Sequence, residues 1–340
     1  PAAKLLFYTA MEGVNEFAQG IRELANAGAD IIVDDIAYLA EPFFQDGPIA
    51  QAVDDVSDDG VLYFSAAGNQ GRGSYQSEFR LGRATVTQQP KQSQRKQSRQ
   101  KQVERFHDFD PGKGVSIFQK ITLTDQEPIQ LVLQWDEPFA SLGQAGSRSD
   151  LTLRVYDADG NLLADSNSFA PEGNSNLGRD AVDILEFTNT TGETADFYLA
   201  IVNTAGPDPG LIQYINYVPT LSQDNAEFFT ESPTVVGHAN AAGAIAVGAI
   251  DYLHTPAFGG KNPLPNFYSS AGGVPILFDE DGNRLDHPII RNKPEIIAPD
   301  TGNTTFLGGM DRPEDKDSFP NFPGTSAAAP HAAAVAALML

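Results

Sequence analysis

Hydrophobic residues in the first 66 positions follow strand and helix periods in turn. Apolar runs predict three buried strands, at residues 5–9, 30–33 and 61–66. Helical spacing of apolar residues between these runs predicts two helices, one over about residues 17–25 that ends before Gly28, and one over about 49–56 with Pro48 in its first turn. Alternating strands and helices with short connections predict a parallel sheet, whose ligands bind at the carboxyl ends of the strands.

The pattern changes after residue 75. Residues 88–102 are rich in Gln, Lys, Arg and Ser, which predicts an exposed linker. Residues 115–217 then show short alternating segments separated by turn signals, which predicts antiparallel strands such as 129–135, 151–156 and 197–202. Apolar strand-like runs of the first kind return at residues 233–236 and 244–249.

These patterns predict one α/β domain that is interrupted by an all-β domain. The α/β part is a doubly wound parallel sheet, and the inserted part is a β-sandwich of the jelly-roll-like type. We expect the core at residues 1–75 and 230–340, the linker at 76–105 and the insertion at 106–229. Surface loops tolerate insertions of this size because loop closure entropy grows slowly with length.

Composition excludes several classes of function. The 45 acidic and 22 basic residues give a net charge of −23, which argues against a nucleic-acid partner and favours an exposed, well hydrated surface. Cysteine is absent, so disulfides and thiolate metal sites are excluded. No apolar run reaches the length of a membrane span.

Two segments carry the strongest chemical signals. Near residue 340, Gly324, Thr325 and Ser326 precede an Ala-rich run in which Pro330 and His331 follow three alanines. This places a serine at a helix N-terminus, where unpaired N–H groups and the helix dipole favour the negative charge of an oxyanion. The second segment ends the strand at 61–66 and leads to Asn69.

The order of these segments resembles subtilisin-like serine proteases. Residues 293–299 resemble the family's core strand and proline turn, and residues 267–272 its Phe-Ser-Ser turn. The resemblance implies a serine endopeptidase that forms an acyl-enzyme at Ser326, with the side-chain amide of Asn69 in the oxyanion hole. It also implies a protein or peptide substrate, a monomer, secretion from the cell, and a cleft lined by Asp35, Ile36, Ala37, Ala66, Ala67, Gly68, Gly324 and Thr325.

The general base is expected outside these 340 residues. In the family, the catalytic Asp and a His-Gly-Thr motif lie upstream of the segment that residues 1–8 resemble, and neither motif occurs here. His238 stands in the wrong order for a triad, and His331 is expected to pack or hydrogen-bond. We therefore expect a fragment truncated at both ends, without its signal peptide and nearly inactive alone.

Two adjacent acids, Asp34 and Asp35, depart from the family pattern at the end of the second strand. Their side chains should point to opposite faces, so at most one faces the cleft. An acidic cleft leaves open an acid-acting Ser-Glu-Asp peptidase of the sedolisin type, with a Glu upstream in place of the His. Other possibilities left open are a preference of Asp35 for basic substrate side chains, and an inactive binding or scaffold relative.

Metal and cofactor signals are weaker. No cofactor is expected to be required, but family members commonly bind structural calcium, and residues 311–317 hold an acidic cluster formed by Asp311, Glu314, Asp315 and Asp317. The acidic loops at 157–161 and 279–283 lack the acid of an EF-hand's twelfth position, and hairpin turns explain them. The glycines at 68, 71 and 73 have the wrong spacing for a dinucleotide fingerprint, and no G-x-S-x-G elbow of an esterase surrounds Ser326.

Overall fold

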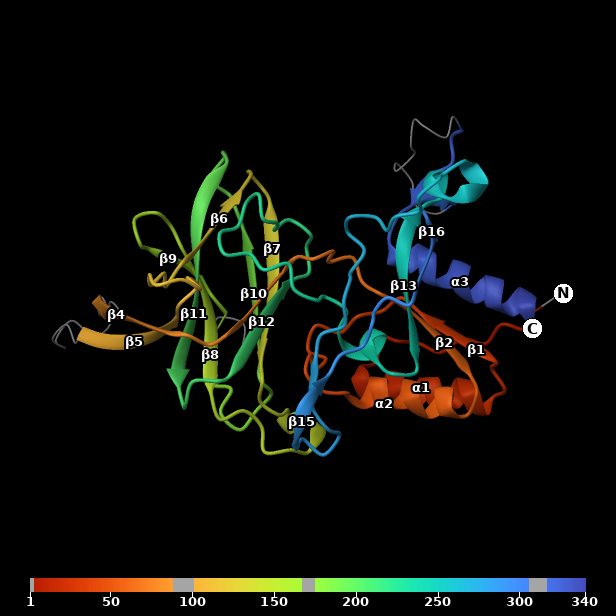
Figure 1. Cartoon of the computed structure of the whole chain (residues 1–340), viewed down its shortest axis with the longest axis horizontal. Helices are drawn as coiled ribbons and strands as arrows, with labels where there is room; N and C mark the ends of the chain where they lie inside the picture. The colour runs from red at the N-terminus through yellow and green to blue at the C-terminus, as the bar shows by residue number, and fades with distance from the viewer. Residues whose placement is uncertain (1–2, 88–100, 167–174, 306–316) are drawn as a thin grey trace. The chain divides into compact units, whose positions relative to one another are not determined.

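The computed structural model describes residues 3–87, 101–166, 175–305 and 317–340, and the chain divides into two compact units (Figure 1). Unit 1 consists of Pro1–Arg72 and Ser232–Leu340, and unit 2 of Gly73–Glu231. Unit 1 contains both chemical segments identified above, Asn69 and Ser326.

Unit 1 is built on a four-stranded parallel sheet. Its order is β1 (Ile31–Asp34), β2 (Leu62–Ala66), β13 (Ala244–Asp251) and β16 (Ile296–Asp300). The strands predicted at 30–33, 61–66 and 244–249 are thereby confirmed. Because all four strands run the same way, Asp34, Ala66, Asp251 and Asp300 end at one edge of the sheet.

Helices pack on both faces of this sheet. On one face lie α1 (Val14–Asn26) and α2 (Pro48–Asp58), which bury Phe17 and Val53 against Tyr63 of β2. On the other face lies α3 (Thr325–Met339), whose alanines pack against Phe64. Tyr63 and Phe64 are neighbours in a strand and so point to opposite faces. Small side chains along α3 let the helix approach the sheet closely.

Short elements connect these layers in unit 1. They are three 3₁₀ helices, η3 (Gly237–Asn240), η4 (Tyr252–His254) and η5 (Pro256–Phe258), the antiparallel pair β14 (Ile276–Phe278) and β15 (Arg284–Ile289), and the pair β17 (Gly302–Asn303) and β18 (Asn321–Phe322).

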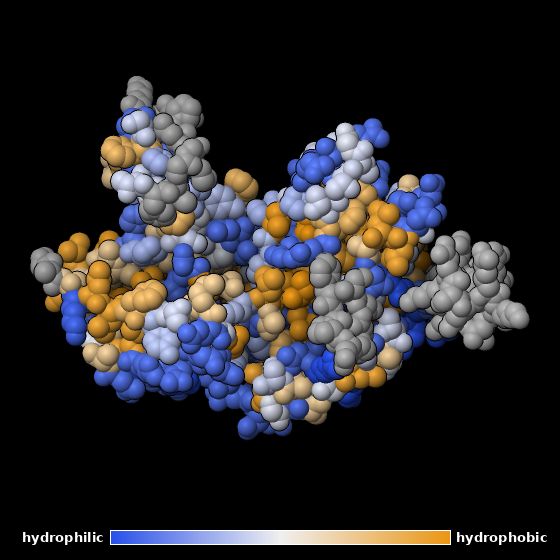
Figure 2. Space-filling view, turned by 180° about the vertical axis from the view of Figure 1, so that it is seen from behind, coloured by the Kyte–Doolittle hydropathy of each residue, from blue (hydrophilic) through white to orange (hydrophobic). Residues whose placement is uncertain are grey.

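The strand predicted at residues 5–9 is wrong. This segment has no regular structure, and the side chains of Leu5 and Phe7 are 91% and 90% exposed. A strand needs a neighbour to satisfy its backbone groups, and none pairs with this segment among the described residues. On the face drawn in Figure 2, hydrophobic residues likewise reach the surface among hydrophilic ones.

Unit 2 consists of two antiparallel sheets. The first has the order β10 (Val182–Thr188), β7 (Pro128–Trp135), β12 (Leu211–Asn216) and β3 (Ser74–Glu78). The second has the order β4 (Leu81–Thr87), β5 (Lys101–His107), β11 (Ala195–Ala205), β8 (Asp150–Tyr156) and β9 (Leu162–Asp165), with β6 (Gln119–Leu123) also paired to β11. One 3₁₀ helix, η1 (Ala140–Leu142), follows β7.

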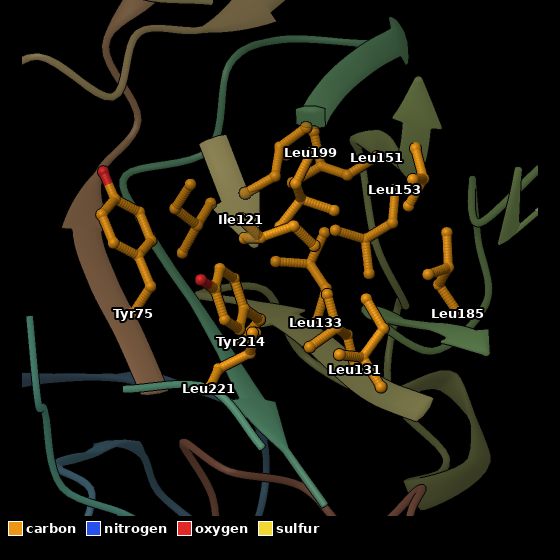
Figure 3. Packing of buried hydrophobic residues seen from close by; sticks show 14 of the residues in the cluster. Tyr75, Ile121, Leu131, Leu133, Leu151, Leu153, Leu185, Leu199, Tyr214 and Leu221 are labelled. Atoms are coloured by element: carbon orange, nitrogen blue, oxygen red, sulfur yellow. The ribbon is translucent and has the colours of Figure 1, made fainter. Parts of the chain in front are cut away.

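Both sheets of unit 2 contribute to one hydrophobic core (Figure 3). Leu131, Leu133 and Tyr214 come from the first sheet, and Leu153 and Leu199 from the second. The strands predicted at 129–135, 151–156 and 197–202 are confirmed. Their alternation of inward apolar residues, which the sequence shows, is what lets the two sheets share this core.

The linker predicted at residues 76–105 is wrong over its described parts. Residues 74–78 form β3, and β4 pairs with β5 in antiparallel register from Leu81↔His107 to Thr87↔Lys101. These polar residues form strands because the backbone N–H and C=O groups of β4 and β5 hydrogen-bond with each other. The polar run at 88–100 lies outside the described residues.

Candidate active site

The turn before α3 presents Ser326. Gly324 has φ 112° and precedes the helix, and its carbonyl accepts hydrogen bonds from the N–H groups of Ala327 and Ala328 at 3.0 and 3.3 Å. The left-handed backbone at Gly324 favours glycine, and a Cβ there would lie 3.3 Å from Nδ2 of Asn69. Ser326 is thus the second residue of the helix, where backbone N–H groups lack intrahelical partners.

Asn69 lies directly against this turn. Its Oδ1 accepts hydrogen bonds from the backbone N–H of Thr325 at 2.9 Å and from the Thr325 hydroxyl at 3.0 Å. The Thr325 hydroxyl in turn accepts from the N–H of Gly68 at 3.2 Å. These bonds fix which end of the amide faces the helix, so Nδ2 is the end left to donate to a ligand.

A buried acid that the sequence analysis missed also fixes the turn. Asp300, at the end of β16, accepts from the Gly324 N–H at 2.8 Å and from Nδ2 of Asn266 at 2.9 Å, and the Tyr268 hydroxyl donates to it as well. Burial and this carboxylate raise the pKa of Tyr268 to about 12, so the phenol remains a donor. The sequence did contain a signal for Asp300, because this acid ends an apolar strand that was predicted to reach the site.

Asp34 and Asp35 point to different partners, as predicted. Asp34 Oδ1 accepts from the Ser65 hydroxyl at 3.0 Å and from Nε2 of His238 at 3.1 Å. Asp35 instead interacts with the Ser326 side chain, which lowers the pKa of this acid. Of the two acids, Asp35 is therefore the one on the side of Ser326.

The environment of Asp35 favours the protonated acid. Partial burial raises its pKa, the neighbouring charge of Asp34 raises it further, and the interaction with Ser326 opposes the change. The acid is nonetheless accessible to solvent. Asp35 can thus exchange a proton near the Ser326 hydroxyl at a higher pH than an ordinary aspartate.

Of the remaining predicted cleft residues, Gly68 is the one with a hydrogen bond to this turn. Ala66 ends β2, Ala67 is buried, and Gly68 contacts Thr325 as described. Ile36 and Ala37 directly follow the two acids, and the N–H of Ile36 points at Asp34 Oδ1 at 3.4 Å. The structure gives no contact of Ile36 or Ala37 with Ser326.

Two histidines of unit 1 make contacts that the sequence left undetermined. His331 donates from Nδ1 to the carbonyl of Pro299 at 2.8 Å, in agreement with the predicted hydrogen-bonding role. His238 is buried between Asp34 and Glu41, with Nδ1 2.9 Å from Glu41 Oε2. Glu41 was missed because nothing in the sequence marks an acid seven residues beyond Asp34 as its neighbour.

No group of three or more His, Cys, Asp or Glu among the described residues is arranged to hold a metal ion. The loop at 157–161 is a hairpin turn in which Asp157 accepts from the N–H groups of Asp159 and Asn161, and Asp279 accepts likewise from Asn283. These carboxylates are used by their own turns and do not fit a calcium site. Asp311, Glu314 and Asp315 lie outside the described residues.

Three comparisons relate the chain to known proteins. The model of the subtilase family matches residues 166–340. A structure of the Clostridium perfringens CspB protease aligns with 95% of this chain and 59% of its own, at 12% identity and a TM-score of 0.47. The enzymatically active domain of tailspike protein 4 of bacteriophage CBA120 aligns with 44% of this chain and 20% of its own, at 14% identity and a TM-score of 0.16.

A search of curated proteins finds no match. The 59% coverage means that this chain spans about three-fifths of the CspB protease chain. No helix in the part of the chain that the structure describes is long and apolar enough to cross a membrane.

Proposed function

Because the chain belongs to the subtilase family, we propose that it is part of a serine endopeptidase that cleaves protein or peptide substrates through an acyl-enzyme at Ser326. The single observation that carries the proposal is the contact between Asn69 and the turn that presents Ser326. These residues are far apart in the sequence, and the turn brings a hydroxyl nucleophile and an amide donor to one place.

The proposed chemistry uses the hydroxyl of Ser326 and the side-chain amide of Asn69. The Ser326 oxygen attacks the scissile carbonyl, and the negative oxygen that forms accepts hydrogen bonds from Asn69 Nδ2 and the Ser326 backbone N–H. Asn69 Oδ1 already faces Thr325, so Nδ2 needs no reorientation when the charge develops. Preorganised donors of this kind stabilise the transition state more than the ground state.

The base and the orienting acid are proposed to lie upstream of these 340 residues. No histidine of the described residues contacts Ser326, and a serine without a base is a poor nucleophile. We further propose that unit 1 is the doubly wound subtilisin-like core and unit 2 an inserted β-sandwich. The protein is proposed to be secreted and monomeric, without nucleic-acid partners or a required cofactor, and the ligands of any structural calcium are left unassigned.

A fluorophosphonate probe tests the proposal on the full-length protein. We expect covalent labelling at Ser326, abolished in Ser326→Ala and slowed about 100- to 1,000-fold in Asn69→Ala, the range reported for loss of one oxyanion donor. Ser57→Ala, a matched serine of α2 outside the site, should label at the original rate. Labelling that persists in Ser326→Ala would refute the assignment.

The raised pKa of Asp35 and its interaction with the Ser326 side chain favour a second candidate, a peptidase that works in acid with carboxylates in place of a histidine. Its labelling rate would be highest below pH 5 and fall toward neutrality, whereas a histidine base requires the rate to rise through about pH 6.5. In the alternative interpretation, Asp35 takes no part in the chemistry and only favours basic substrate side chains. A folded full-length protein that is never labelled would identify an inactive relative.

A further inference from the structure

Three ionisable side chains are buried together at the end of β1. The side chains of His238, Glu41 and Asp34 are 2%, 6% and 7% exposed. Burial of ions is costly unless each charge is paired and hydrogen-bonded. Nothing in the proposed chemistry at Ser326 uses this cluster, so its presence needs another explanation.

Geometry fixes the charge on the ring. Nδ1 of His238 lies 3.0 and 2.9 Å from the two carboxylate oxygens of Glu41, and Nε2 lies 3.1 Å from Asp34 Oδ1. A neutral imidazole has one N–H, so its other nitrogen would direct a lone pair at a carboxylate. With both carboxyl groups ionised, both contacts are favourable only if both nitrogens carry protons. The two carboxylates accordingly raise the pKa of His238 well above its usual value, which makes the ring a buried imidazolium.

Aromatic side chains lie near the ring. The Phe17 ring of α1 meets it edge-on, with the centroids 5.8 Å apart. Burial raises the pKa of Tyr38, in the same connection as Glu41, and of Tyr63 of β2, and the charges of Asp34 and Glu41 raise both values further. Both phenols therefore stay neutral, and the Tyr38 hydroxyl donates to the carbonyl of Ala10.

The backbone of η3 is shaped to admit Glu41. Gly237 has φ +59°, and a Cβ on it would lie 2.8 Å from the Glu41 carboxyl carbon. The backbone N–H of His238 donates to the same carboxylate at 3.2 Å. Only glycine permits both the backbone conformation and this close approach. Gly237 leaves room for the Glu41 carboxylate and the His238 N–H binds it, so the backbone of η3 forms a site for this side chain.

The cluster connects to Ser326 through the backbone of β1. His238 and Ser65 hold Asp34 on the inner side of the strand end. Asp35 directly follows Asp34, the last residue of β1, and α3, which carries Ser326, packs on this strand. Fixing Asp34 therefore restricts where Asp35 can point, and the Ser326 side chain is close enough to Asp35 to lower the pKa of this acid. A rotation of the strand end that released Asp34 would carry Asp35 away from the serine.

We propose that Glu41 and His238 are positioning residues, which hold the Asp34–Asp35 strand end so that Asp35 faces the Ser326 hydroxyl. The inference rests on the proposed function of Ser326. It assigns no chemical step to His238, which does not touch Ser326. Its role is to keep a carboxylate that borders the nucleophile in one orientation.

The first experiment measures labelling of the full-length protein by the fluorophosphonate across pH. His238→Gln leaves two buried carboxylates without a cation and can fail to fold, so the main variant is the double substitution Glu41→Gln with His238→Gln, which removes one positive and one negative charge. We expect this double variant to label about 10- to 100-fold more slowly, the loss typical of a misplaced reactive group, and with a shifted pH profile.

The matched control is His107→Gln in unit 2, which also removes a fully buried histidine with two ring hydrogen bonds. It should label at the original rate and with the original profile. Labelling of the double variant at the original rate and profile would overturn the positioning role. Failure of the wild-type protein to label at all would instead overturn the proposed function.

A second measurement needs no substitution in the cluster. Nuclear magnetic resonance of ring ¹⁵N-labelled protein should show two N–H signals for His238 at pH 8, and these should shift in Ser326→Ala, whereas the His107 signals should not. A single ring N–H for His238, or signals that are identical in both proteins, would contradict the proposal. This readout does not depend on activity.

Discussion

The two structural units each bury a histidine, and one ring is neutral whereas the other is positively charged. In unit 2, burial lowers the pKa of His107 to about 3, and the Arg80 charge contributes to the same direction. In unit 1, burial alone would lower the pKa of His238, but Glu41 and Asp34 outweigh it and raise the pKa well above the usual value of 6.5. Burial is thus common to both sites, and the neighbouring charges decide the outcome.

The hydrogen-bond partners of the two histidines agree with these charge states. His107 pairs with the Tyr75 hydroxyl at 2.8 Å and receives the backbone N–H of Arg80 on Nδ1 at 3.3 Å, which suits a neutral ring with one acceptor nitrogen. His238 faces carboxylate oxygens on both sides. The neutral ring of His107 is hydrogen-bonded inside unit 2, whereas the charged ring of His238 holds the strand end beside Ser326.

The largest expected effect is the loss of the buried cation. We predict that His238→Leu lowers the free energy of unfolding by about 3–5 kcal/mol, because two buried carboxylates are left uncompensated. Chemical denaturation of the full chain, with hydrogen exchange of β1 and β2 peptides to localise the change, measures it. Adding Glu41→Gln should recover part of the loss, and a double variant as unstable as the single would contradict the pairing.

The positive charge of His238 also determines how the stability of unit 1 changes with pH. Its pKa is raised on folding, so its stabilisation is fully present below the unfolded value of 6.5 and is lost as the pH rises through the higher folded pKa. Exchange of β1 peptides should therefore accelerate in alkaline solution. His107 has its pKa lowered on folding, so its contribution is retained there.

Unit 2 should respond to pH through Asp183. Partial burial raises the pKa of this acid from 3.8 to about 7, against the hydrogen bonds from Ser166 and Leu153. Its contribution to stability is present below 3.8 and is lost as the pH rises through about 7, by up to about 4 kcal/mol for a shift of this size. Asp183→Asn should flatten this pH dependence in β8 and β10 peptides, and an unchanged slope would exclude Asp183 as its source.

The neutral histidine should matter less than the charged one. We predict that His107→Phe costs about 1–3 kcal/mol, because it leaves the Tyr75 hydroxyl and the Arg80 N–H without their ring partner but leaves no buried ion. Denaturation of the full chain measures the loss. A cost equal to that of His238→Leu would remove the distinction between the two sites.

The smallest effect compares two glycines with left-handed backbones. Gly237→Ala and Gly160→Ala both incur the strain of that conformation, about 1–2 kcal/mol, but only the first places a Cβ against Glu41, since nothing lies within 4 Å of the second. We expect Gly237→Ala to be the more destabilising in thermal melts. Equal costs would show that Glu41 can move away without loss.

Periodicity was sufficient for the elements that local interactions specify. The helices near Phe17 and Val53 and the strands at Tyr63 and Leu153 form where apolar spacing predicted them. The strand at residues 5–9 and the linker at 76–105 were wrong because pairing decides both: an apolar run with no neighbour stays irregular, and polar strands pair in the β4–β5 hairpin. Pairing partners are distant in sequence and leave no local signal.

The sequence by itself determined the family, the turn that presents Ser326 and the opposite directions of Asp34 and Asp35, because motifs and strand alternation are local properties of the chain. The resemblance also predicted that Asn69 and Ser326 act at one site. Only the tertiary structure decided which end of the Asn69 amide meets the turn, that Asp300 anchors it, and that His238 lies between Asp34 and Glu41. Charges and hydrogen bonds act through space at about 3 Å, and a linear order does not specify which residues come that close.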